Sequence, residues 1–188
     1  MLPIDFTSEL QKFLPTTAFA QRIAALSGFR LNLTADGPMV GAAGELIAED
    51  YFRQQKSNGH ISSFKYTGNQ PGHDIEVLLG GKLFTIDVKT KRRSFEPAEY
   101  FEMSVPAYLY NNPQYRDPDF FLCVQVNCDK ANRNILTRGW VVGYISKENY
   151  LLKRTLVAQG SQVGGSQGTQ GVMPTDVYNV EFRHLEHP

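Results

Sequence analysis

Two acidic residues and a lysine flank a short glycine turn: Asp74 lies before the turn, and Asp87 and Lys89 lie after it. The pair Gly80-Gly81 between two apolar runs predicts a two-residue β-hairpin. Pairing about that turn places Asp74 directly opposite Asp87, with Lys89 two residues further along the same face. Most apolar residues of both runs fall on the other face, which we expect to pack on the core: Ile75, Val77, Leu79, Phe84, Ile86 and Val88.

This pairing of like charges needs a physical reason, because two carboxylates facing each other destabilise a strand pair. A divalent cation supplies one. Mg²⁺ takes one or two carboxylates and fills the rest of its coordination shell with water and phosphate oxygens. The lysine beside the carboxylates can hold a phosphate or orient an attacking water. The alternative is a solvated polar face on an edge hairpin, where charged residues have no special role.

A third acid, Glu45, belongs to a helix predicted over residues 38–59. It lies one position off the apolar stripe of this helix, so it flanks the face that packs on the sheet. From there Glu45 can point into the same cleft and bind a metal directly or through water. The alternative is a surface glutamate stabilised by the positive end of the helix dipole.

The composition is that of an ordinary globular domain, with 188 residues, 41% of them hydrophobic and 20% charged. The chain has 19 basic and 19 acidic residues, so its net charge is zero and does not predict a polyanionic partner. Basic residues nevertheless cluster between Lys82 and Arg93, where they can bind phosphates. We find no apolar run of membrane-spanning length and no signal-like start, and expect a cytoplasmic protein with no membrane partner.

The predicted elements run in the order helix, three strands, short helix and two strands, followed by a final strand. This order predicts an α/β or α+β fold with a mixed sheet. Residues 1–34 have a helical pattern, and the glycine- and glutamine-rich segment 159–171 has the composition of a flexible loop. The short helix begins near Pro106, and the strands are expected near residues 60–68, 73–79, 82–91, 119–127, 139–146 and 176–185.

These motifs resemble the PD-(D/E)xK nuclease superfamily, which includes many restriction endonucleases. The resemblance rests on GELIAEDYF, GHD and IDVKTK, and covers residues 39–146. It implies a restriction-endonuclease-like catalytic core, a mixed central sheet flanked by helices. Residues 1–38 would then be an N-terminal helical extension, and residues 147–188 a C-terminal embellishment of the same single domain.

The resemblance also implies roles for individual residues. Asp74 and Asp87 resemble the two acids of the family, Lys89 resembles its lysine, and Glu45 resembles the helix glutamate of a subset of members. One departure is His73, which stands where the family pattern has proline. His73 is therefore expected either to contact a metal ligand or a phosphate, or to be an ordinary loop residue.

The implied chemistry is Mg²⁺-dependent hydrolysis of phosphodiester bonds in DNA, with Mn²⁺ able to replace Mg²⁺. The metal would be held by the two aspartates and the backbone carbonyl of Val88, with help from Glu45. The basic run Lys91, Arg92 and Arg93 would hold flanking phosphates. Gln125, on the next strand, either faces the same cleft or belongs to an ordinary polar strand face.

Several functions remain compatible with the sequence. The leading expectation is a restriction-type or phage-encoded endonuclease, acting as a homodimer because one site per chain cannot cut two strands at once. A structure-specific resolvase or repair nuclease of the same fold is an alternative, although such enzymes are usually more basic. A non-catalytic nucleic-acid-binding or assembly module is a further alternative, although such modules tend to lose the charged residues that this chain keeps. The last alternative is an unrelated α/β protein in which the motif is accidental.

Overall fold

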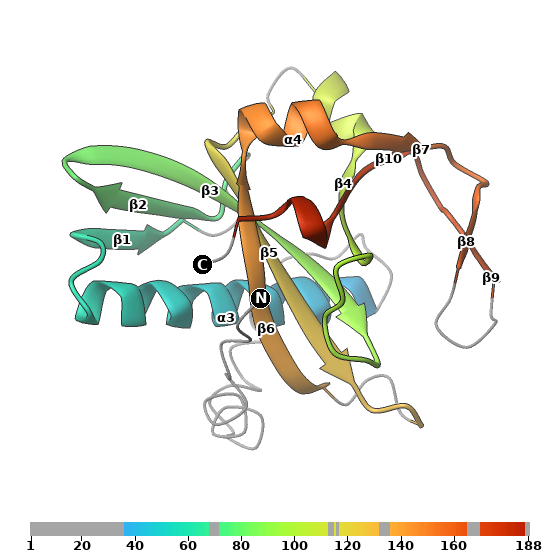
Figure 1. Cartoon of the computed structure of the whole chain (residues 1–188), viewed down its shortest axis with the longest axis horizontal. Coiled ribbons are helices and arrows are strands. Elements are labelled where there is room, and N and C mark those ends of the chain that lie inside the picture. Colours follow the sequence, from blue (N-terminus) through green and yellow to red (C-terminus); the bar gives the residue numbers. More distant parts are fainter. Residues whose placement is uncertain are drawn as a thin grey trace.

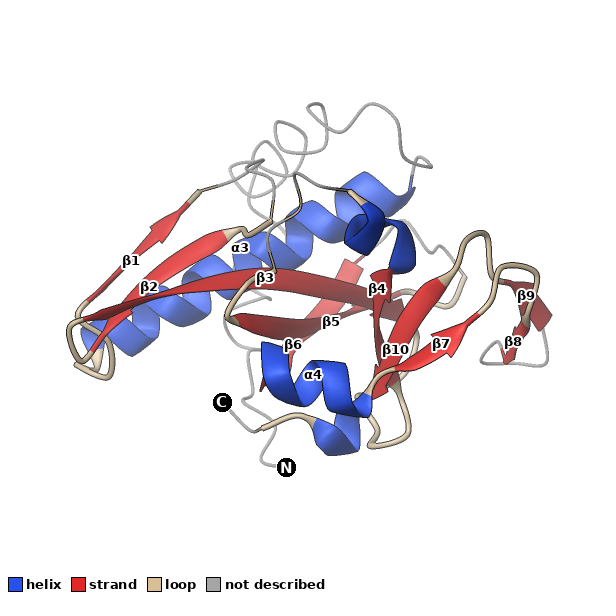
Figure 2. Ribbon diagram, turned by 90° about the horizontal axis from the view of Figure 1, so that it is seen from above, coloured by secondary structure: helices blue, strands red, loops and turns tan. Residues whose placement is uncertain are grey.

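The computed structural model describes residues 36–67, 72–112, 115, 117–131, 136–164 and 170–186. The helices predicted over residues 1–34 lie outside this part of the chain. The described chain is a mixed α/β fold, in which a five-stranded mixed sheet carries one long helix on one face and a layer of short elements on the other (Figures 1 and 2).

The five strands follow the order β1-β2-β3-β5-β6 across the sheet. The first three form an antiparallel meander, β5 runs parallel to β3, and β6 returns antiparallel to β5. The sequence predicted all five strands and the mixed sheet, and both predictions are confirmed. Their bounds are β1 Ser63–Tyr66, β2 Ile75–Leu79, β3 Lys82–Arg93, β5 Phe120–Cys128 and β6 Leu136–Ser146.

The hairpin between β2 and β3 forms as predicted. Gly80 and Gly81 both have positive φ, 56° and 79°, as a type I′ turn requires. Ile75 pairs with Ile86, which is the predicted register. Ile75, Val77, Ile86 and Val88 of these strands are buried in one core cluster, so Asp87, one position from both Ile86 and Val88, lies on the opposite face of the sheet.

Helix α3, Asp36–Ser57, lies along the apolar face and packs on β3, β5 and β6. Its buried residues Ala43, Ile47 and Tyr51 form the predicted stripe. The helix approaches β3 closely at Gly44, where an added Cβ would lie 1.8 Å from Thr90 Oγ1. Within the described residues, no helix has the length and apolar character needed to cross a membrane.

A second layer covers the face of the sheet that carries Asp87. Its largest part is a three-stranded sheet in the order β4-β10-β7. A second core cluster fills the space between this layer and the main sheet. The sequence predicted neither β4 nor α4. The layer consists of β4 Glu102–Pro106, η1 Ala107–Asn111, α4 Lys147–Lys153, β7 Thr155–Val157, β10 Val177–Glu181 and η2 Phe182–His184.

The segment expected to be a flexible loop, residues 159–171, contains paired strands. Strand β8, Gln162–Gly164, pairs antiparallel with β9, Gln170–Val172. Glycine and glutamine give no alternating pattern, but a strand ladder is made of backbone hydrogen bonds and does not depend on one. Composition alone therefore gave the wrong expectation for these two short stretches.

Candidate functional site

The two aspartates lie where β3 continues past the end of β2. The paired positions of these strands stop at Ile75 and Ile86, while β3 pairs with β5 from Ile86 onward. The backbone N–H of Asp74 donates to the Ile86 carbonyl at 2.9 Å. The next hydrogen bond along β3 is made by a side chain instead of a strand: Asp74 Oδ2 accepts the backbone N–H of Val88 at 2.8 Å. One acid is thereby fixed to the strand that carries the other.

Asp87 is buried, with 6% of its surface exposed. Burial raises the pKa of its carboxyl to about 7; Lys89 opposes this rise, and the neighbouring Asp74 adds to it. The Lys89 ammonium lies 2.7 Å from Asp87 Oδ2. The structure therefore brings together the three residues that the hairpin register predicted.

Tyr115 belongs to this site, and sequence reasoning missed it. Its hydroxyl lies against the Asp87 carboxyl, and burial followed by the charge of Asp87 raises the pKa of the phenol above its usual range. The hydroxyl is buried. No pattern in the segment around Tyr115 pointed to this position, because its place depends on packing between distant elements.

Glu45 is buried, with 3% exposed, so it is not the surface glutamate of the alternative interpretation. The hydroxyl of Tyr66, on β1, donates a hydrogen bond to its carboxylate. Among the described residues, no three His, Cys, Asp or Glu side chains are grouped so that they could hold a metal ion. A role for Glu45 in metal binding stays a prediction.

His73 and Gln125 lie near the site in different ways. His73 Nε2 is 3.3 Å from Glu76 Oε1, so its side chain contacts a neighbouring acid on β2. Gln125 aligns with Lys91 across β3 and β5, which places it on the same face as Asp87. It is fully buried, and its Nε2 donates to the Phe95 carbonyl at 2.6 Å. Neither residue contacts the aspartates through a described hydrogen bond.

Lys91, Arg92 and Arg93 do not share one face of β3, because successive side chains of a strand point to opposite faces. Lys91 and Arg93 share the face of Asp87, while Arg92 lies on the α3 face. Burial, and then Arg93, lowers the pKa of Lys91 to about 8. The Arg93 guanidinium lies 5.1 Å from the Phe101 ring centre, beside the second layer. The structure does not place all three side chains on one open surface, so their role as a phosphate clamp stays a prediction.

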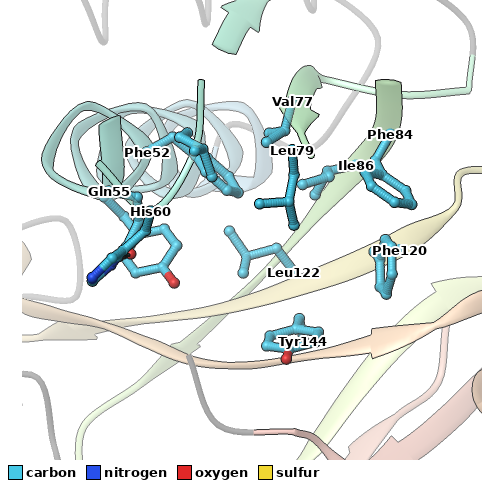
Figure 3. A pocket seen from close by; sticks show the side chains of 12 residues that line it. Phe52, Gln55, His60, Val77, Leu79, Phe84, Ile86, Phe120, Leu122 and Tyr144 are labelled. Carbon is cyan, nitrogen blue, oxygen red and sulfur yellow. Dashed lines mark hydrogen bonds between the residues drawn. The ribbon is translucent and has the colours of Figure 1, made fainter. Parts of the chain in front are cut away.

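A separate apolar pocket of about 300 Å³ opens on the α3 side of the sheet (Figure 3). Phe52 of α3, Leu122 of β5 and Tyr144 of β6 line it, and His60 and Gln55 form a polar rim with a 2.7 Å hydrogen bond. Because its strand residues belong to the face opposite Asp87, this pocket is not part of the aspartate site.

Comparison with models of known protein families gives no match to this chain, and comparison with curated proteins gives none either. The functional interpretation therefore rests on the aspartates, the lysine and their geometry.

Proposed function

We propose that this chain is a Mg²⁺-dependent DNA endonuclease of the PD-(D/E)xK type, built on a restriction-endonuclease-like core. One observation carries the proposal: Asp74 and Asp87 converge at the end of β2, with Lys89 bonded to Asp87 at 2.7 Å. A purely structural role accounts poorly for two neighbouring carboxylates of which one is buried, because a negative charge on either one raises the free energy of ionising the other.

The donor set fits a hard divalent cation. Asp74, Asp87 and the backbone carbonyl of Val88 offer oxygen ligands, which Mg²⁺ and Mn²⁺ prefer over nitrogen or sulfur. Burial raises the pKa of Asp87, and a bound cation would favour its ionised form. When bound, the metal would polarise a water molecule and neutralise charge that develops on the phosphate.

The residues of the chain contribute in distinct ways. Asp74 is held in place by the Val88 N–H, so its carboxylate keeps a fixed direction. Lys89 keeps a positive charge beside Asp87, where it can orient a water molecule and stabilise negative charge on a phosphate oxygen. The low exposure of Asp87 keeps bulk water away from the carboxylate and strengthens these interactions.

DNA as substrate and a homodimer as the working form are parts of the same proposal. Lys91 and Arg93 follow Lys89 on the face of Asp87 and are the basic residues that would hold DNA phosphates beside the aspartates. Cleavage of both strands of a duplex by one site per chain calls for two chains. A single-strand nick by a monomer would contradict the dimer but not the nuclease.

The proposal is tested by cleavage of supercoiled plasmid and short duplexes with Mg²⁺ or Mn²⁺. We expect the wild type to cut, and Asp87→Asn and Lys89→Met to bind DNA without cutting. Two variants of exposed charges on α4, Glu148→Gln and Lys153→Met, are the matched controls and should cut as the wild type does. If the wild type neither cuts nor binds a divalent cation in calorimetry, the nuclease proposal is wrong.

A further inference from the structure

We propose that two copies of this chain form a dimer through the outer edge of β7, by antiparallel pairing of the two β7 strands about a twofold axis at Leu156. The β7 edge consists of Thr155, Leu156 and Val157. This inference rests on the homodimer that belongs to the proposed function, and it goes further by naming the surface that forms the dimer.

The position of β7 in its sheet is the first argument. β7 pairs with β10 on one side, and none of the described strands lies on its other side. Alternate backbone N–H and C=O groups of β7 therefore point outward, where they can pair with another strand. An added β-strand is the partner that fits such a row of groups directly.

The β7 edge is also apolar. Leu156 pairs with Tyr178 on β10, and Tyr178 pairs with Val105 on β4, so the three side chains lie in one row on the same face of the sheet. Val105 is fully buried and Tyr178 packs against the second core cluster, but Leu156 is 54% exposed. The core-facing row therefore continues to the β7 edge without cover.

The other edges of the two larger sheets are protected against pairing with another chain. β1 carries Lys65, whose side chain is 70% exposed, and β6 is bridged at Tyr144 by Glu186 of the C-terminal segment. β4 contains Glu102 and Pro106. Charged residues, proline and covering segments keep edge strands from pairing with other chains. Within the described residues β7 has none of these features, which favours β7 as the edge that pairs.

A second copy fits this edge because the pairing is its own complement. A twofold axis at Leu156 pairs all three residues of both strands, so that Leu156 lies opposite the partner's Leu156. Thr155 then lies opposite Val157 of the partner subunit. Just before the strand, Arg154 falls opposite Ala158 of the partner subunit, so no like charges face each other.

The sequence that follows β7 favours a protein partner over DNA at this edge. No charged residue lies between Arg154 and Asp176, although 20% of the residues in the whole chain are charged. A surface that binds DNA phosphates needs lysine or arginine, whereas the buried centre of a protein interface is depleted of charged residues.

The ribbon formed by β8 and β9 also lacks support within its own chain. It extends away from the main sheet beyond β7 (Figures 1 and 2), and its strands make extensive contacts only with each other among the described elements. An isolated two-stranded ribbon is at best marginally stable in water. Antiparallel pairing of β7 directs the chain that follows it toward α4 of the partner subunit. Since Leu152 of α4 is 78% exposed, the dimer would support the ribbon and cover this leucine.

The first experiment measures molecular mass by sedimentation equilibrium over a range of protein concentrations. We expect the wild type to have twice the 21.1 kDa of one chain. Leu156→Lys places two positive charges opposite each other at the axis, so the dissociation constant of the dimer should rise at least about tenfold. Leu83→Lys adds the same charge at a leucine of β3 with similar exposure, 56%, and should dimerise as the wild type does.

A second experiment tests the register and does not depend on an added charge. Directly opposite residues of an antiparallel pair have Cα atoms about 4.5–5.5 Å apart, within the range that a disulfide spans. Leu156→Cys should therefore form a covalent dimer when it is oxidised with copper phenanthroline, as non-reducing electrophoresis would show. The native Cys123 and Cys128 are buried, so the wild type should not crosslink, and neither should Leu83→Cys.

The outcomes separate the β7 edge from the function on which the inference rests. If the wild type is dimeric but Leu156→Cys does not crosslink, or if folded Leu156→Lys stays dimeric, another surface forms the dimer and the inference is overturned, while plasmid cleavage still supports the nuclease. Circular dichroism shows whether Leu156→Lys is folded, and the crosslink decides if it is not.

Two further results also overturn the inference. One is a wild type that stays monomeric at every concentration. The other is a Leu156→Lys variant that remains dimeric but binds DNA differently from the wild type, since the β7 edge would then contact DNA. Conversely, a wild type that crosslinks through Leu156→Cys but neither cuts DNA nor binds a divalent cation contradicts the nuclease and leaves the β7 dimer in place.

Discussion

Asp74 and Val88 are joined by a hydrogen bond in which the aspartate Oδ2 accepts the backbone N–H at 2.8 Å. Val88 directly follows Asp87, so this bond connects the first acid to the strand that carries the second acid and Lys89. It forms because β2 stops pairing at Ile75 and leaves this N–H of β3 to a side chain. Asp74 therefore has two tasks, one in the sheet and one in the candidate site.

Two substitutions of Asp74 should separate those tasks. Asp74→Ala removes the acceptor for the Val88 N–H, so we expect a loss of about 1–2 kcal/mol in the free energy of unfolding and no cleavage. Asp74→Asn keeps an acceptor oxygen but loses the charge, so it should unfold near the wild-type denaturant concentration and still fail to cut. Urea unfolding and plasmid cleavage measure the two effects. Cleavage by Asp74→Asn at the wild-type rate would contradict the metal-ligand role.

The raised pKa of Asp87 predicts a pH dependence of stability. Burial raises the pKa of Asp87 to about 7 in the folded protein, whereas an unfolded aspartate loses its proton near the ordinary pKa of 3.8. Between these values the folded state binds more protons, so the contribution of Asp87 to the free energy of unfolding falls as pH rises. Asp87→Asn should remove this contribution and be more stable than the wild type above pH 7 by roughly 2–4 kcal/mol.

Urea unfolding of the metal-free protein across this pH range measures the effect as a difference between the wild type and Asp87→Asn. Glu148→Gln, which changes an exposed acid on α4, is the control and should follow the wild type. A constant difference at every pH would show that Asp87 is ionised throughout.

Lys89 should matter for both the charge and the cleavage step. Lys89→Met removes the ammonium that lies 2.7 Å from Asp87 Oδ2, so the pKa of Asp87 should rise further. We expect cleavage at neutral pH to fall at least about a hundredfold, since a positioned charge that stabilises the transition state is lost. Single-turnover cleavage measures the loss, and Lys153→Met should show none. Comparable loss in both variants would point to a general effect of charge on DNA binding.

Gly44 sets how closely α3 approaches the strand that carries the site. In Gly44→Ala the new Cβ would lie 1.8 Å from Thr90 Oγ1 and 2.7 Å from Thr90 Cγ2, so helix and strand must separate. We expect a loss of about 1–3 kcal/mol in the free energy of unfolding. Adding Thr90→Ala removes both γ atoms and should restore part of the loss, as chemical denaturation would show. Full wild-type stability of the single variant would contradict the close approach.

The sequence by itself determined the central sheet and the hairpin. Alternation of apolar residues and the Gly80-Gly81 turn are local signals, and both act within a few residues of the chain. They are sufficient to fix the register of β2 against β3. That register brings Asp74 and Asp87 together and puts Lys89 on their face, so the charged set of the candidate site could be found without a structure.

Only the tertiary structure decided how that charged set is surrounded. The burial of Asp87, the arrival of Tyr115 and the enclosure of Lys91 all depend on the second layer, whose β4 and α4 had no clear pattern in the sequence. Glu45 likewise has its partner on β1, 21 positions further along the chain. Contacts of this kind form between distant segments and depend on the shape of the packed core. Local spacing specifies which side chains share a strand face, but it does not specify what packs against that face.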